Sequence, residues 1–155
     1  GLLKPNLPDR VNYINAETIA KELGIQVELS YRNNDSNYQN IISAYVKTKS
    51  RTYEISGSVF DHKNLRLINI LGRDLEITPK GNMIFLCNVD VPGVIGKIGT
   101  LFGRLGINIA AYLLSRNKAN NEAFAVIRLE RPLDNGEILK LKRLDDIKWF
   151  YQIKV

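Results

Sequence analysis

Polar side chains of the kind that bind a small zwitterion occur in two short stretches of the chain. Asn88 and Asp90 close an apolar run, and Pro92-Gly93 then makes a turn into an amphipathic segment. Asn108 begins a further apolar run two residues after Gly106. Strand ends and helix N-termini present unpaired backbone N–H groups, which suit a carboxylate or another anion. These stretches therefore predict a binding site for a small molecule.

The side chains at these positions have complementary chemistry for an amino acid. The Asp90 carboxylate suits an ammonium group, and the Asn88 and Asn108 amides can donate to a carboxylate or accept from a hydroxyl. Backbone N–H groups near Gly93 and Val94 add a partial positive charge for the carboxylate. An alternative is purely structural: Asp90 caps the following helix, and Asn108 occupies a turn before a strand.

Residue types for catalysis or metal binding do not form a cluster in the sequence. The chain has one histidine, His62, and one cysteine, Cys87, which lies in an apolar run and is predicted to be a buried thiol. No Gly-x-Gly-x-x-Gly motif occurs, so a dinucleotide site is not predicted. We therefore expect no catalytic residue, no metal site and no cofactor in this chain.

Composition indicates a globular protein. The 155 residues are 45% hydrophobic and carry a net charge of +6, without a run of five or six like charges. This pattern argues against a nucleic-acid-binding tail. No apolar run approaches the length of a membrane span, and no signal peptide is visible, so we expect a cytoplasmic protein without a membrane partner. Because the chain begins at Gly1-Leu2-Leu3 without Met, we expect an excised fragment.

Hydrophobic periodicity predicts a β-α-β-β-α-β order for residues 82–155. This order is ferredoxin-like. The predicted elements are a strand at Met83–Asp90, a helix at Val94–Leu105, strands at Ile107–Leu114 and Ala123–Leu129, a helix from Asp134 to Leu144 and a strand from Ile147 to Val155.

The first predicted helix of this half has an apolar face and a small-residue stripe. Gly96, Gly99 and Gly103 form the stripe, and each costs roughly 1 kcal/mol of helix propensity, which indicates close approach by another backbone or a ligand. The predicted apolar face consists of Val94, Ile98, Leu101 and Leu105, broadened by Ile95 and Phe102.

Residues 1–81 predict a separate α+β domain, divided from residues 82–155 at a turn-forming cluster, Pro79–Asn82. Asn15 is a predicted N-cap and Gly24 a predicted helix stop. Alternation at Ile25–Leu29 predicts a strand. Two predicted strand pairs follow, Ile41–Thr48 with Arg51–Phe60 and Leu65–Leu71 with Asp74–Thr78.

Both halves resemble the D-3-phosphoglycerate dehydrogenase family. Val89–Gly99 followed by Gly106–Ala110 is similar to the ACT domain at the C-terminus of these enzymes. Val11–Ala16, Ala20–Ile25 and Gly57–Phe60 are similar to their intervening, or allosteric substrate-binding, domain. The resemblance implies an intervening domain that lacks its first strand, followed by an ACT domain. It also implies that the catalytic and NAD-binding domains are absent here, so NAD would belong to the full-length enzyme.

The resemblance also implies a regulatory site for L-serine at an ACT dimer interface, and hence a homo-oligomer. One subunit would contribute Asn88 and Asp90, and its neighbour Asn108 and Ile109. Pro92, Gly93 and Val94 would complete the site. The family further implies an anion site in the first domain, for which Lys47, Lys49, Arg51 and Arg66 are candidates, with Arg73 nearby. Basic residues on strands are alternatively solvated surface.

Three other functions remain alternatives. An RNA-binding module shares the β-α-β-β-α-β order, but it needs aromatics on its central strands within an RNP1-like pattern, which the strand Ala123–Arg128 does not supply. The regulatory part of an iron–sulfur L-serine dehydratase has a similar two-domain arrangement. A structural oligomerisation region without an amino-acid ligand is the third.

Overall fold

The structure is a computed structural model that describes residues 7, 11–31, 38, 40–61, 63–117 and 119–155. The chain divides into two compact units, residues 1–35 and 36–155. Both β-sheets belong to the second unit. The predicted division into residues 1–81 and 82–155 stays a prediction. His62 lies outside the described residues. Among the described helices, none has the length and apolar character needed to cross a membrane.

The first unit contains one helix, α1, at Ala16–Glu22 within its described residues. Asn15 occupies the predicted N-cap position, and Gly24 ends the helix with φ +72°, a conformation that glycine adopts readily. The strand predicted at Ile25–Leu29 is wrong, since these residues form no strand. Val27 and Leu29 are exposed. Alternating apolar residues form a strand only where a neighbouring strand pairs with their backbone.

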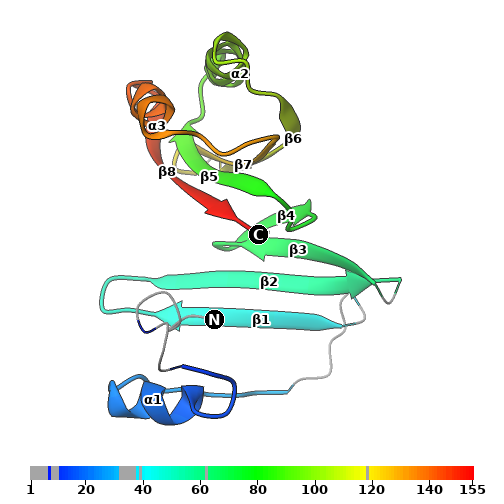
Figure 1. The fold of residues 1–155 in the computed structure, drawn as a ribbon, viewed down its shortest axis with the longest axis vertical. Coiled ribbons are helices and arrows are strands. Elements are labelled where there is room, and N and C mark those ends of the chain that lie inside the picture. The colour runs from blue at the N-terminus through cyan, green and yellow to red at the C-terminus, as the bar shows by residue number, and fades with distance from the viewer. Residues whose placement is uncertain (1–6, 8–10, 32–37, 39, 62, 118) are drawn as a thin grey trace. The chain divides into compact units, whose positions relative to one another are not determined.

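The first sheet is a four-stranded antiparallel meander in the order β1-β2-β3-β4 (Figure 1). Both strand pairs that the sequence predicted are present, and the structure joins them through the pairing of β2 with β3. Leu71 and Gly72 connect the last two strands with φ +56° and +74°, the left-handed conformations of a tight hairpin turn. The strands are β1 at Ile41–Lys47, β2 at Thr52–Phe60, β3 at Asn64–Ile70 and β4 at Arg73–Ile77.

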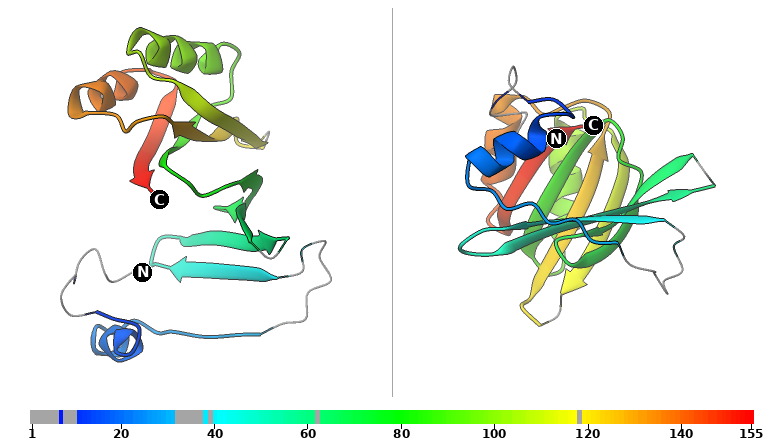
Figure 2. Two further views of the ribbon diagram at one scale, coloured as in Figure 1. Left: turned by 45° about the vertical axis from the view of Figure 1, so that its right-hand side comes forward. Right: turned by 90° about the horizontal axis from the view of Figure 1, so that it is seen from below.

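The second sheet has the order β6-β7-β5-β8, with antiparallel pairing throughout. Helices α2 and α3 cover the same face of this sheet (Figure 2). The predicted α+β class with a ferredoxin-like second part is therefore confirmed. The elements are β5 at Asn82–Val89, α2 at Val94–Arg104, β6 at Ile109–Asn117, β7 at Glu122–Leu129, α3 at Asn135–Lys142 and β8 at Ile147–Lys154.

The two faces of the second sheet bury different cores. Val94, Ile98 and Phe102 of α2 pack with Ile84 and Leu86 of β5 on the helix-covered face. Ile95 was predicted to broaden this apolar face, but it is 51% exposed, because it lies one residue out of the 94–98–102 spacing. The opposite face packs against residues from β3 and β4; this core contains Ile70, Leu75, Ile77, Met83, Phe124 and Val126.

Candidate functional site

The polar end of β5 carries a buried amide. Asn88 is 3% exposed and pairs with Ala123 of β7 and Ile147 of β8. Its Nδ2 donates to the Val89 carbonyl oxygen at 2.6 Å, whereas its Oδ1 is buried and accepts no hydrogen bond from any described residue. A buried acceptor without a partner costs free energy, so this oxygen favours a ligand or water that donates to it.

Asp90 forms an ion pair that the sequence analysis did not foresee. Its Oδ2 accepts a hydrogen bond from Nε of Arg116 at 2.7 Å. Its backbone N–H donates to the Asn121 carbonyl oxygen, which fixes the chain after β5. Arg116 lies near the end of β6, where Asn117 pairs with Glu122. The local sequence gives no signal for this pair, because the two residues meet only through the register of three strands.

The turn into α2 consists of exposed residues followed by a core residue. Gly93 has φ +94°, and its carbonyl oxygen accepts the first helical hydrogen bond, from the Lys97 N–H at 2.9 Å. Val94 is buried in the core, so its side chain cannot contact a ligand from solvent. This turn would therefore bind a ligand only through the backbone N–H groups of the first turn of α2. Lys97 also pairs with Asp146, which precedes β8.

Asn108 and Ile109 lie at the other end of the sheet. Ile109 pairs with Leu129, which in turn pairs with Asn82 at the start of β5. From Asn82 to Asn88 along β5 is about 20 Å at the usual rise of a strand. The Asn108 amide donates instead to Oε2 of Glu130 at 2.9 Å. One chain therefore does not bring the two halves of the predicted site together.

Two glycines near this site have opposite conformational requirements. Apart from the adjoining residues and the nearby backbone of the helix itself, no described atom lies within 4 Å of a Cβ built on Gly93 or Gly96, so space does not distinguish them. We expect Gly93→Ala to destabilise the fold by about 1–2 kcal/mol, because φ +94° is strained for alanine. Gly96→Ala should stabilise it by about 0.5–1 kcal/mol, since alanine favours a helix. Chemical denaturation of both variants checks this; equal effects would contradict the left-handed turn.

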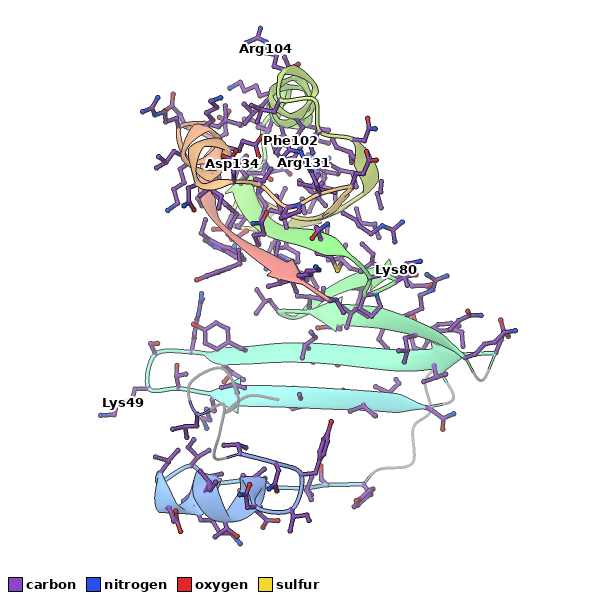
Figure 3. All side chains as sticks on the ribbon, in the orientation of Figure 1. Lys49, Lys80, Phe102, Arg104, Arg131 and Asp134 are labelled. Atoms are coloured by element: carbon purple, nitrogen blue, oxygen red, sulfur yellow. The ribbon has the colours of Figure 1, made fainter. Side chains whose placement is uncertain are left out.

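The four residues predicted to bind an anion are not brought together. Lys47 pairs with Thr52, and Arg66 pairs with Ser58 six residues further along β2, which is about 20 Å away. Nη1 of Arg66 donates to Thr78, and its Nε lies 3.6 Å from Oε1 of Glu76. Lys49 lies at the tip of the β1–β2 hairpin (Figure 3).

A cavity of about 240 Å³ lies beside Arg51 instead. Cys87 is buried, as predicted, and forms part of the cavity lining; burial is the main cause that raises the pKa of its thiol. The sequence analysis missed this cavity, whose lining residues come from separate strands. Among the described residues, no group of three or more His, Cys, Asp or Glu side chains is arranged to hold a metal ion.

Residues 1–71 match the family model of the D-3-phosphoglycerate dehydrogenase intervening domain. The D-3-phosphoglycerate dehydrogenase of Bacillus subtilis is 31% identical over 147 residues, which cover 95% of this chain. The Synechocystis protein of the same name is 28% identical over all 155 residues, and that of Archaeoglobus fulgidus 30% identical over 149 residues, or 95% of the chain. The chain spans 28% of the length of each of these curated relatives. Nearly the whole chain is therefore similar to one part of the D-3-phosphoglycerate dehydrogenases, and its first 71 residues carry their intervening-domain sequence.

Proposed function

We propose that this chain is a regulatory region of a D-3-phosphoglycerate dehydrogenase and that residues 82–155 are an ACT domain that binds L-serine between two copies. The observation that carries the proposal is the buried Oδ1 of Asn88, which lacks a partner within the described residues. It lies at the end of β5 where the sequence predicted the ligand. A serine ammonium or hydroxyl group can donate the missing hydrogen bond.

The charges beside Asn88 also suit a zwitterion. The Asp90 carboxylate and the Arg116 guanidinium form an ion pair. An amino acid carries the same two charges, so it can pair its ammonium with Asp90 and its carboxylate with Arg116 or with the first N–H groups of α2. The Arg116 side chain is largely exposed, which leaves it free to adjust to a ligand.

Pairing of two copies would complete the site. β6 is an edge strand of its sheet and presents backbone groups to a second copy. In an antiparallel β6–β6 pair, the start of one strand, with Asn108, lies near the end of the other. Along α2, a Cβ built on Gly96, Gly99 or Gly103 would have no described atom within 4 Å other than those of the adjoining residues and the nearby backbone of α2 itself. A second helix could approach this stripe closely.

For the activity of the whole protein, our proposal is based on the names of its relatives. We propose NAD-dependent oxidation of 3-phosphoglycerate in L-serine biosynthesis, with L-serine acting as a regulator through the paired ACT domains. No Gly-x-Gly-x-x-Gly motif occurs in these 155 residues, so no residue of this chain is assigned to NAD. Ligand binding would favour the paired state by its differential affinity, and catalysis would respond through linkage.

Thermal unfolding with L-serine, glycine and L-alanine tests the amino-acid site. At 100 times its dissociation constant, L-serine should add about 2.7 kcal/mol, which is roughly 5–10 °C in the unfolding midpoint. Asn108→Ala should abolish the shift. Asn135→Ala is the matched control, because Asn135 is exposed at the start of α3, and its shift should equal that of the unchanged chain.

Sedimentation of the same samples separates ligand binding from pairing. L-serine should increase the fraction of paired chains, and Asn108→Ala should remove this effect. Pairing without any response to an amino acid would overturn the serine proposal in favour of a structural oligomerisation region. A shift of equal size in Asn108→Ala would show that the ligand binds elsewhere.

A further inference from the structure

Both halves of the proposed serine site are occupied by side chains of the same chain. Asp90 accepts a hydrogen bond from Nε of Arg116 at 2.7 Å, and the Asn108 amide donates to Oε2 of Glu130 at 2.9 Å. An amino acid can therefore use these atoms of Asp90 and Asn108 only after Arg116 and Glu130 have moved. The two groups that must move have opposite charges, so each is a suitable partner for the other.

Arg116 and Glu130 both have unused capacity for such a contact. The Arg116 side chain is 59% exposed, whereas that of Asp90 is 14% exposed, so the arginine is the partner that can turn away. Glu130 is exposed just after β7, and no ion pair joins it to any described lysine or arginine. The adjacent Arg131 is not available, because it donates to both oxygens of Glu137.

These two charges lie at opposite ends of an unprotected edge strand. β6 pairs only with β7, so one row of its backbone N–H and C=O groups has no strand partner within the described residues. No charged side chain occurs from Ile109 to Ser115. The other edge strand, β8, carries Lys148 and Lys154, and lysines on an edge oppose the addition of another strand. A second copy of this sheet is therefore better accepted by β6.

A two-fold pair of antiparallel β6 strands brings the opposite ends together. Arg116 lies near the end of β6, and Glu130 lies beside its start, where its N–H donates to the Asn108 carbonyl oxygen at 3.2 Å. With the axis at Leu113, the middle of β6, Arg116 of one copy lies opposite Ala110 of the other. Two-fold symmetry repeats the contact, so each pair of chains contains it twice.

We propose that pairing of two copies exchanges these contacts, so that Arg116 of each chain leaves Asp90 and binds Glu130 of the other copy. The exchange frees the Asp90 carboxylate for an ammonium group and the Asn108 amide for a carboxylate or hydroxyl. The single chain thus keeps the site unavailable, and the paired chains open it. This inference rests on the proposed function, to which it adds the regulation of the site.

The exchange also gives the ligand a reason to favour pairing. L-serine would meet free Asp90 and Asn108 side chains only in the paired state, so its affinity for that state exceeds its affinity for the single chain. Such a difference is what a ligand needs to shift an equilibrium. With Arg116 engaged by Glu130, the ligand carboxylate is left to Asn108 and the first N–H groups of α2.

Charge reversal in two separate chains tests the contact between copies. Arg116→Glu alone sets like charges against each other in both contacts, and so does Glu130→Arg alone. Each variant should therefore raise the dissociation constant of its pair about tenfold or more. An equal mixture of the two variants joins opposite charges in both contacts, and its pairing in sedimentation should return to that of the unchanged chain.

Mixing distinguishes a contact between copies from one within a chain. Neither variant regains its own Asp90–Arg116 or Asn108–Glu130 contact in the mixture, so only a contact with the other copy can restore pairing. Both variants keep a net positive charge, because one reversal does not cancel the net charge of +6. Long-range attraction between the two variants would therefore not account for the recovery.

Lys154→Glu is the matched control, because Lys154 is exposed on the other edge strand and its reversal should leave pairing unchanged. Urea denaturation should show that each variant alone is folded, since Arg116 and Glu130 are exposed. A mixture that pairs no better than its separate variants would overturn the exchange. If the unchanged chain still pairs and responds to L-serine, that failure rejects the exchange alone and leaves the proposed function standing.

The thermal shift with L-serine provides a second readout of the opening step. The shift should be weak in each variant alone and should return in the mixture. A mixture that pairs without regaining the shift would contradict the release of Asp90 and Asn108. An unchanged chain that neither pairs nor responds to L-serine would overturn both the exchange and the proposed function.

Discussion

Replacing Phe102 with alanine should lower the free energy of unfolding by about 3–5 kcal/mol, the cost of removing a large aromatic ring from a core. Phe102 is 0% exposed and points from α2 toward the sheet (Figure 3). It packs with Ile98 of its own helix and with Ile84 and Leu86 of β5. Because the surrounding strands are held in a ladder, they can collapse only partly into the cavity that remains.

Ile95→Ala on the same helix is the matched control. Its side chain is 51% exposed, so we expect a change within about 0.5 kcal/mol. Urea denaturation followed by Trp149 fluorescence measures both variants, since Trp149 lies on β8 of the same sheet. A loss of less than about 1 kcal/mol for Phe102→Ala would contradict the packing of α2 on this sheet.

The start of α3 should make stability depend on pH. Both oxygens of Glu137 accept from Arg131, at 2.7 and 2.8 Å, and Oε2 also accepts from the Asp134 N–H at 2.9 Å. The Asp134 side chain in turn accepts a hydrogen bond from the Glu137 N–H. These two reciprocal hydrogen bonds between Asp134 and Glu137 form a capping box. Arg131 and Asp134 both precede α3 in the chain, and both bind Glu137 (Figure 3). The Arg131 hydrogen bonds, followed by that of Asp134, lower the pKa of Glu137 from 4.5 to about 2.

The sign of this shift fixes the direction of the pH effect. The folded-state pKa of Glu137 lies below its ordinary value, so its contribution to stability is complete above pH 4.5. It is lost as the pH falls from 4.5 toward 2, because in this window the unfolded chain binds a proton at Glu137 that the folded chain does not, which favours unfolding. Stability measured by urea denaturation should therefore fall steeply in this window.

Glu137→Gln isolates this contribution. We expect it to cost about 1.5–3 kcal/mol at neutral pH, the usual value of hydrogen bonds to a charged group, and to flatten the acid dependence. Glu76→Gln is the control, because its side chain is 53% exposed and its ion pair with Arg66 is long. It should change stability by less than about 0.5 kcal/mol. If the stability of Glu137→Gln fell in acid as steeply as that of the unchanged chain, other carboxylates would be the cause of the loss of stability at low pH.

The sequence by itself determined the order of helices and strands in residues 82–155. Apolar periodicity, the Pro92-Gly93 turn and the Asp134 cap are local signals, and each acts within a few residues of its own position. The four strands of the first sheet followed from the same kind of signal. The exception was Ile25–Leu29, whose alternation is local but whose strand would need a partner that these residues lack in the structure.

Only the tertiary structure decided how the candidate site residues group. The register of β5, β6 and β7 separates Asn108 from Asn88 and brings Arg116 to Asp90. The packing of one sheet on the other creates the cavity that gathers Arg51, Arg73 and Trp149. These contacts join residues far apart in the chain, and their energies depend on burial and distance, which no local pattern encodes. Local propensity thus specified the helices and strands, and long-range packing specified which of their polar side chains meet.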